Sequence, residues 1–432
     1  LAYPVARFMH EMTRPSEKRG IPAVMNNKLF WVAFGAVIAL HLVRGLYAWD
    51  LTFFEIPLRY DLSAIKSLFP TAGEVKGNAW LFRPKIFLSV VGFAFFLTTQ
   101  VSLSLGLAGF VWLIFGSIMI ANGGALQGSY IGAEMNNLLL FGAYLGGGLM
   151  VGYIGRRYYM NVIASACGLP RQTDTPLYAV WAARLLAICF VLSVVMLTQL
   201  AGLAWPLSIL LMIMILGIVL MVSRINAETG AIMIQPYWFP VGMLTALLSI
   251  DAVGPVAYVV MAVACVVLIG DTRELIMAYL VNGLWFADHA DTEAASETAP
   301  AADAEHGAQT TRRASPSRVV WPMGAMMLMG FGVALLATFY FGYQQGAGGL
   351  HAWTSDILPA KPFDNLSGHL GDLSSRQILH EAVAASGLER LTMIDTAWST
   401  VGWIALGLAL VLGCWWARLR VPWWPLHPVI FL

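Results

Sequence analysis

Charged residues are scarce in this chain: only 11% of its 432 residues are Asp, Glu, Lys or Arg, whereas 59% are hydrophobic. A water-soluble domain normally has about a quarter of its residues charged. A chain with so few charges would aggregate in water, so the composition excludes a soluble globular protein. The formal net charge of +1 provides no field for steering polyanions, and we expect no nucleic-acid partner.

Cysteine is also scarce, and the four cysteines lie far apart, with no Cys-x-x-Cys pair among them. This spacing predicts neither a disulfide framework nor a metal site, and it favours free thiols packed in membrane helices. His380-Glu381 has no second histidine four residues on, so a zinc-protease motif is excluded. Phosphate-loop and nucleophile-elbow motifs are missing as well. We therefore expect no metal, no cofactor and no enzymatic activity.

Long apolar stretches are abundant. A membrane-spanning helix needs about 20 predominantly apolar residues, and the sequence predicts an all-α polytopic membrane protein with about eight spans. Residues 84–121 are too long for one straight span and are interrupted near Thr98–Gln100, so they form either two full spans or a re-entrant helix pair, which we favour. Pro236 and Pro240 predict a broken helix. The apolar stretches are residues 29–49, 84–121, 138–155, 177–201, 205–223, 231–250, 254–270, 319–342 and 397–416.

Polar composition divides the chain into three parts. Residues 1–286 are expected to form a membrane bundle that contains the re-entrant-like segment. Residues 287–318 are rich in Ala, Ser, Thr and acidic residues, which predicts a disordered linker. Residues 319–432 are expected to form two further spans that flank a polar segment, 343–396. Basic clusters beside the spans place the linker in the cytoplasm and the polar segment outside. Both ends read as cut, as in a piece of a longer protein.

The strongest candidate site is the segment from Ser223 to Gly230, SRINAETG. Polar groups at membrane depth are costly and usually face a cavity or one another. Arg224 and Glu228 are four residues apart and can pair on one helix face, while Asn226 lies between them. The segment is either a break that contacts a substrate or ion, with Glu228 titrating, or an interfacial ion pair that caps a hairpin.

Thr99, Gln100 and Ser102 form a second candidate site. They either line the tip of a re-entrant segment and contact a solute, or they form hydrogen bonds between membrane helices. His41, inside the first span, is a candidate for proton coupling, with a hydrogen bond to a neighbouring helix as the alternative. The glycine-rich segment 122–137 contains Glu134, which could titrate if buried, although the segment could also be a plain loop.

Several stretches carry a resemblance to a known family. They are LAYPVARFMHEM, NNKLFWVAFGAVIALHLVRGLY, IPLRYDLS, PKIFLSVVGFAFFLTTQVSLSLG, SRINAETG and RLRVPWWPLHPV, in that order. Together they resemble an uncharacterised family of large bacterial membrane proteins that are labelled peptide transporters by distant similarity to oligopeptide transporters. The resemblance implies a location in the bacterial inner membrane. Thr98 and Gln100 stand where the family often has a proline and a glutamate, which weakens a proton-coupling role there.

Three functions follow from these features. The leading hypothesis is a secondary transporter of a small polar solute or peptide, in which Glu228 and His41 couple protons. Its expected substrate contacts are Gln100, Ser102, Thr99, Arg224, Asn226 and Glu228. The alternative is a non-transporting subunit or scaffold that contacts other membrane subunits, or a second copy of itself, besides lipid. The third is a membrane enzyme that acts on lipid-linked substrates through outer carboxylates. A polar cavity that reaches Gln100 and Glu228 would favour the first hypothesis over the second.

Overall fold

The computed structural model describes residues 3–14, 22–51, 54–75, 79–123, 131–169, 175–231, 234–271, 275–298, 317–346, 356–385 and 389–432. These ranges are helical or irregular, and an isolated antiparallel bridge joins Arg59 to Lys85. The chain divides into two compact units that alternate along the sequence. Residues 1–124, 227–230 and 281–315 form the first unit, and residues 125–226, 231–280 and 316–432 form the second.

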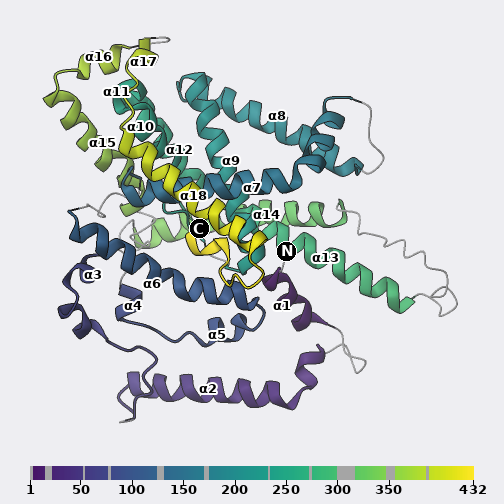
Figure 1. Ribbon diagram of the computed structural model, residues 1–432. Coiled ribbons are helices and arrows are strands. Elements are labelled where there is room, and N and C mark those ends of the chain that lie inside the picture. The colour runs from purple at the N-terminus through teal and green to yellow at the C-terminus, as the bar shows by residue number, and fades with distance from the viewer. Residues whose placement is uncertain are drawn as a thin grey trace. The chain divides into compact units, whose positions relative to one another are not determined.

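Seven helices in the described residues are long and apolar enough to cross a membrane. This confirms the predicted all-α polytopic membrane protein. The 254–270 stretch forms a shorter apolar helix, α12 (Pro255–Ile269). The seven long helices are labelled in Figure 1: α2 (Lys28–Ala48), α6 (Thr99–Ala121), α7 (Met135–Ala166), α8 (Leu177–Gln199), α9 (Trp205–Thr229), α14 (Ser317–Gln345) and α18 (Trp398–Arg420).

In the first unit, the N-terminal helix α1 (Pro4–Thr13) packs on the last residues of α9. The Tyr3 amide donates a hydrogen bond to the Ala227 carbonyl at 2.8 Å. Gly230 has a φ of 66°, and a Cβ on it would lie 2.5 Å from Phe93 and 2.6 Å from Pro4. Only glycine fits such a position without strain. The same residue therefore turns the chain after α9 and leaves room for α1 to pack there. The unit also contains η1 (Ala23–Asn26), η2 (Ser63–Ser67), α3 (Pro70–Glu74) and α4 (Ala79–Phe82).

The segment 84–121 forms a short helix, α5 (Leu88–Ala94), followed by the full-length α6. The predicted interruption is real, because Thr98 is the extended N-cap residue of α6. It lies at the start of a span, however, and not at the centre of one. Thr99, Gln100 and Ser102 therefore occupy the first turn of α6.

In the second unit, α7 and α18 lie side by side (Figure 1). Small residues allow the two backbones to approach closely: a Cβ on Gly142 would overlap the Ile404 carbonyl, and one on Gly407 would overlap the Leu139 carbonyl. Gly142 and Gly146 form a Gly-x-x-x-Gly pair, a spacing common where membrane helices pack closely. This contact joins segments that are far apart in the sequence.

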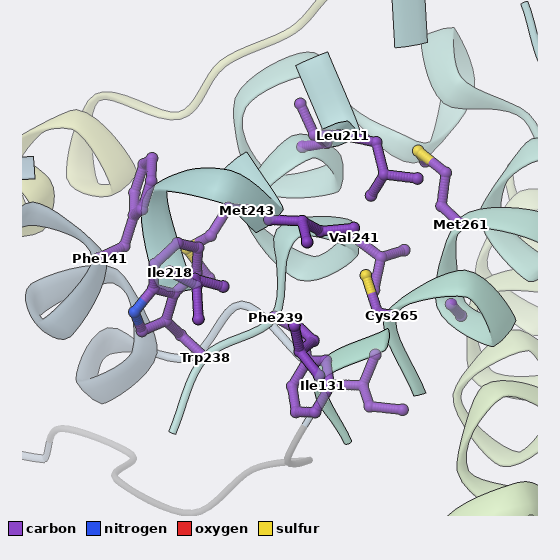
Figure 2. Packing of buried hydrophobic residues seen from close by; sticks show 14 of the residues in the cluster. Ile131, Phe141, Leu211, Ile218, Trp238, Phe239, Val241, Met243, Met261 and Cys265 are labelled. Carbon is purple, nitrogen blue, oxygen red and sulfur yellow. The ribbon is translucent and has the colours of Figure 1, made fainter. Parts of the chain in front are cut away.

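The core of the second unit surrounds a helix that is broken twice. The three pieces of this helix are α10 (Pro240–Leu248), α11 (Ile250–Val253) and α12. Ser249 and Gly254 lie at the two breaks, and both have positive φ values. Side chains from α9, α10 and α12 converge around Val241, as Figure 2 shows, and Ile131 packs beside Phe239. Pro240 occupies the first turn of α10, so the predicted break before it is confirmed.

The polar segment that was expected outside the membrane is largely helical. Its described residues form α15 (Leu358–Ser375), α16 (Leu379–Ala384) and α17 (Glu389–Thr392), which contact α11 and α12. The last helix of the second unit is η7 (Pro428–Phe431). The expected linker begins inside α13 (Ile276–Thr298), a helix that continues well past residue 287, and residues 299–316 lie outside the described ranges.

Candidate functional site

A polar cavity of about 290 Å³ lies within the second unit. Three segments line it: residues 131–134 before α7, the broken helix α10–α12, and α15. Its floor is continuous with the apolar core, because Ile131 and Tyr258 belong to both. The lining residues with polar side chains are Glu134, Thr245, Tyr258, Asp364, Asn365 and His369, and Ala133 with glycines 132, 242 and 368 completes the described lining.

The first wall is held close to α10 by a glycine. A Cβ on Gly242 would overlap the backbone carbonyls of residues 131 and 132, so a larger residue would push this segment away. Asn137 fixes the segment from within, because its Nδ2 donates to the Gly132 carbonyl at 2.8 Å and to Glu134 Oε2 at 2.9 Å. Glu134 is thus oriented at the cavity wall.

The second wall is one face of α15. Asp364, Asn365, Gly368 and His369 follow the spacing of consecutive turns and share this face. The His369 ring meets the Tyr258 ring edge-on, with centroids 4.8 Å apart. Burial lowers the pKa of His369, an effect that Asp372 partly opposes. The imidazole is therefore biased toward its neutral form, which can both donate and accept a hydrogen bond.

Asn365 has unused hydrogen-bonding capacity. Its side chain faces the Tyr258 hydroxyl, but its Nδ2 is buried and makes no hydrogen bond within the described part of the chain. A buried polar atom without a partner is costly, and such atoms are expected to be satisfied by water or a ligand. Because this nitrogen has almost no accessible surface, it lies behind the cavity lining and does not face the cavity.

Side chains that follow α15 hold it to the broken helix. Arg376 donates to both carboxylate oxygens of Asp251, at 2.9 Å and 2.6 Å. Arg390 donates to the carbonyls of Ala252 and Val253, at 2.9 Å and 2.5 Å. Backbone groups freed by a broken membrane helix must find partners inside the protein, and these arginines supply them. The side chains that hold the cavity wall in place therefore also provide hydrogen-bond partners for the broken helix.

Thr396 supplies a further hydrogen bond to the broken helix. Its hydroxyl donates to the Leu247 carbonyl at 2.5 Å, near the end of α10. At the first break, Ser249 Oγ accepts a hydrogen bond from the Asp251 amide at 3.3 Å. Side chains thus form hydrogen bonds with backbone groups at both breaks of the helix, so the surrounding fold stabilises the discontinuity.

The residues predicted from the sequence lie elsewhere, and none of the six proposed substrate contacts lines this cavity. Asn226 is buried and donates to the Ala231 carbonyl at 2.6 Å, which closes the turn at Gly230. Arg224 and Glu228 are half-buried on the last turns of α9. In the first turn of α6, Gln100 is half-buried, while Thr99 and Ser102 are exposed. His41 is exposed on α2, a helix without a buried residue.

Sequence reasoning identified Glu134 but missed the other cavity residues. Asp364, Asn365 and His369 lie in a segment that was described only as polar. One signal could have found them: their spacing puts a carboxylate, an amide and an imidazole on the same helical face. Among the described residues, no group of three or more His, Cys, Asp or Glu side chains is arranged to hold a metal ion.

The fold and the cavity define a helical, multi-pass membrane protein with a small polar cavity beside a discontinuous helix. The chain belongs to DUF6785, a family of unknown function, whose match covers residues 1–432. This agrees with the expected membership of an uncharacterised family. Neither the search of curated proteins nor the search of solved structures found a match.

Proposed function

We propose that this protein is a secondary transporter that moves a small polar solute across the bacterial inner membrane, with the cavity of the second unit as its substrate site. The observation that carries the proposal is the cavity itself, which combines polar side chains with a twice-broken helix. Ligand pockets usually measure about 300–1,000 Å³. At about 290 Å³, this one suits a small solute or a very short peptide.

Broken helices support this assignment because many secondary transporters bind their substrates where membrane helices are discontinuous. In our proposal, α10–α12 forms the fixed wall of the site, and α15 is the wall that moves. When the bonds of Arg376 and Arg390 release, α15 separates from α12 and opens the cavity further. The protein then has no enzymatic role, and its titratable groups bind or couple and do not perform covalent chemistry.

Proton coupling through Glu228 and His41 remains part of the proposal, at a site separate from the substrate. The test is uptake by purified protein in proteoliposomes with and without an inward proton gradient. Glu228→Gln should keep substrate binding but lose the stimulation by the gradient. Unchanged stimulation, with normal uptake, would remove Glu228 from this role. His41→Asn is tested in the same way.

The scaffold hypothesis is favoured by a different observation. The apolar windows of α2 and α14 contain no buried residue, so both helices present their surfaces to lipid or to another membrane protein. In this alternative, the cavity would be a solvated space without a transported ligand.

Solute uptake separates the two proposals. Proteoliposomes are challenged with labelled amino acids, dipeptides and small amines, and uptake is compared with protein-free vesicles. Transport predicts saturable uptake of at least one of these solutes. If no solute accumulates, and the protein instead copurifies with a fixed set of membrane proteins, the scaffold hypothesis holds.

A further inference from the structure

We infer that the cavity selects small organic cations that carry a primary amine. This inference rests on the proposed function for its transport aspect, but the binding that it describes stands on the geometry of the cavity alone. Two carboxylates, Glu134 and Asp364, line the cavity, and none of the described residues that line it is a lysine or an arginine. The charged side chains of the described lining are therefore acidic.

An ammonium group suits the acceptor chemistry of these two carboxylates. Glu134 is held in place by the hydrogen bond from Asn137, and Asp364 approaches from α15, so the two carboxylates face the cavity from separate elements. An ammonium ion is a compact charge with three donors. Its hydrogen bonds to carboxylates are charge-assisted and stronger than neutral ones.

The remaining lining suits the rest of such a solute. Tyr258 and His369 form an aromatic wall, with their rings edge-on at 4.8 Å, against which a short alkyl chain can pack. A solute with an amine at one end and a short alkyl chain behind it uses both features.

A metal ion fits these residues less well. Metal sites in proteins draw several carboxylate, imidazole or thiolate ligands to a single point. The described residues contain no group of three or more such side chains close enough for this. The cavity volume also exceeds what a bare ion occupies, and its aromatic wall offers no ligand atoms to an ion.

Binding of a charge series to the purified protein tests the inference. The probes are 4-aminobutan-1-ol, 1,4-diaminobutane, 1,4-butanediol and succinate, which have similar lengths and different charges. Isothermal titration at neutral pH should show that both amines bind at least tenfold more tightly than the diol, and that succinate does not bind. Equal or tighter binding of the diol or succinate would overturn the inference, as would binding of Na⁺ or Ca²⁺ alone that the amines do not displace.

Charge-neutralising variants locate the site. Asp364→Asn and Glu134→Gln should each weaken amine binding about tenfold or more while changing diol binding little. Asp364 is exposed on α15, so its variant retains the fold even if the Glu134 variant does not. Asp395→Asn, an exposed residue outside the cavity lining, is the matched control and should bind like the parent. Amine preference that survives both cavity variants would contradict the assignment.

Uptake by proteoliposomes distinguishes this inference from the proposed function. Amines that bind with the expected preference but do not accumulate would leave the inference intact and contradict transport. Saturable uptake of neutral or anionic solutes, without amine binding, would leave transport intact and contradict the inference.

Discussion

Arg376 forms a bidentate ion pair with Asp251, with N···O distances of 2.9 Å and 2.6 Å. The Asp251 side chain is only 14% exposed, whereas that of Arg376 is 42% exposed. The pair links the residue that directly follows cavity helix α15 to α11, the central piece of the broken helix. Its strength therefore sets how easily the cavity wall separates from the rest of the second unit.

Breaking this pair should loosen α15 without unfolding the protein. We expect Asp251→Asn to lower the free energy of local opening of α15 by about 1–2 kcal/mol, because a charge-assisted bidentate contact becomes a neutral one. Hydrogen exchange of the α15 amides measures this opening. Asp372→Asn is the control, since Asp372 contacts the same arginine at 3.0 Å but its side chain is 56% exposed. Equal exchange rates in the two variants would contradict the assignment.

Arg390 should contribute more to stability than its charge suggests. Arg390→Met would leave the carbonyls of Ala252 and Val253 without their donor, and an unsatisfied buried acceptor costs about 1–3 kcal/mol. We expect a loss of about 2 kcal/mol in the free energy of unfolding, measured by denaturant titration in detergent micelles. Lys361→Met removes a cation of α15 for which no such contact is found in the described residues, and it should change stability little. If Arg390→Met leaves the free energy of unfolding unchanged, water has replaced the arginine as the hydrogen-bond donor.

Close packing of α7 on α18 makes a prediction with an internal control. Gly142→Ala would place a Cβ into the Ile404 carbonyl, whereas Gly148 on the same helix has no atom within 4 Å of that position. Overpacking of this kind costs about 1–3 kcal/mol, while alanine at an open helical position favours the helix by up to about 1 kcal/mol. Thermal unfolding should therefore show Gly142→Ala destabilised and Gly148→Ala unchanged or stabilised. The opposite order would mean that the two helices do not pack as described.

Acid should destabilise the protein through His427. Burial, with the charges of Arg418 and Arg224, lowers the pKa of His427 to about 4, against about 6.5 in an unfolded chain. Between these values the unfolded state binds a proton that the folded state does not, so stability falls as pH decreases from about 6.5 to about 4 and is constant above this window. We expect the melting temperature to follow this course.

His427→Asn removes the titrating group while keeping an acceptor for the Val429 amide, which lies 3.3 Å from Nδ1. Its melting temperature should fall less between pH 6.5 and pH 4 than that of the parent. His380→Asn replaces an exposed histidine and should keep the parent's acid sensitivity. If the His427 variant is as acid-sensitive as the parent, another group causes the loss.

Local features of the fold were predictable because they depend on nearby residues. Apolar runs of sufficient length predicted the spans, and the break at the start of α10 followed from the chemistry of Pro240. The break at Ser249 was not predictable, because serine carries no strong signal for a positive φ. Helix α13 continues to Thr298, inside the segment that was expected to be a linker, where alanine and glutamate favour a helix.

The cavity could not be predicted because its walls come from distant parts of the chain. Glu134 is far in sequence from Asp364 and His369, and nothing in either segment indicates that they meet. The polar residues of SRINAETG attracted attention because they follow an apolar run. Asn226 has a structural task instead, because it closes a turn, and Gly230 beside it provides room for α1. Polarity within a membrane helix indicates a partner but does not say whether that partner is a ligand.

The most direct test fills the cavity from a position that tolerates a larger side chain. Gly368 lines the cavity, and a Cβ there meets no atom within 4 Å; Gly371, on the same helix, is equally open but does not line it. Both variants, Gly368→Leu and Gly371→Leu, should fold, because each replaces an exposed helical glycine. Solute uptake by proteoliposomes should be abolished in the first and retained in the second. Equal uptake in both variants would contradict a substrate site in this cavity.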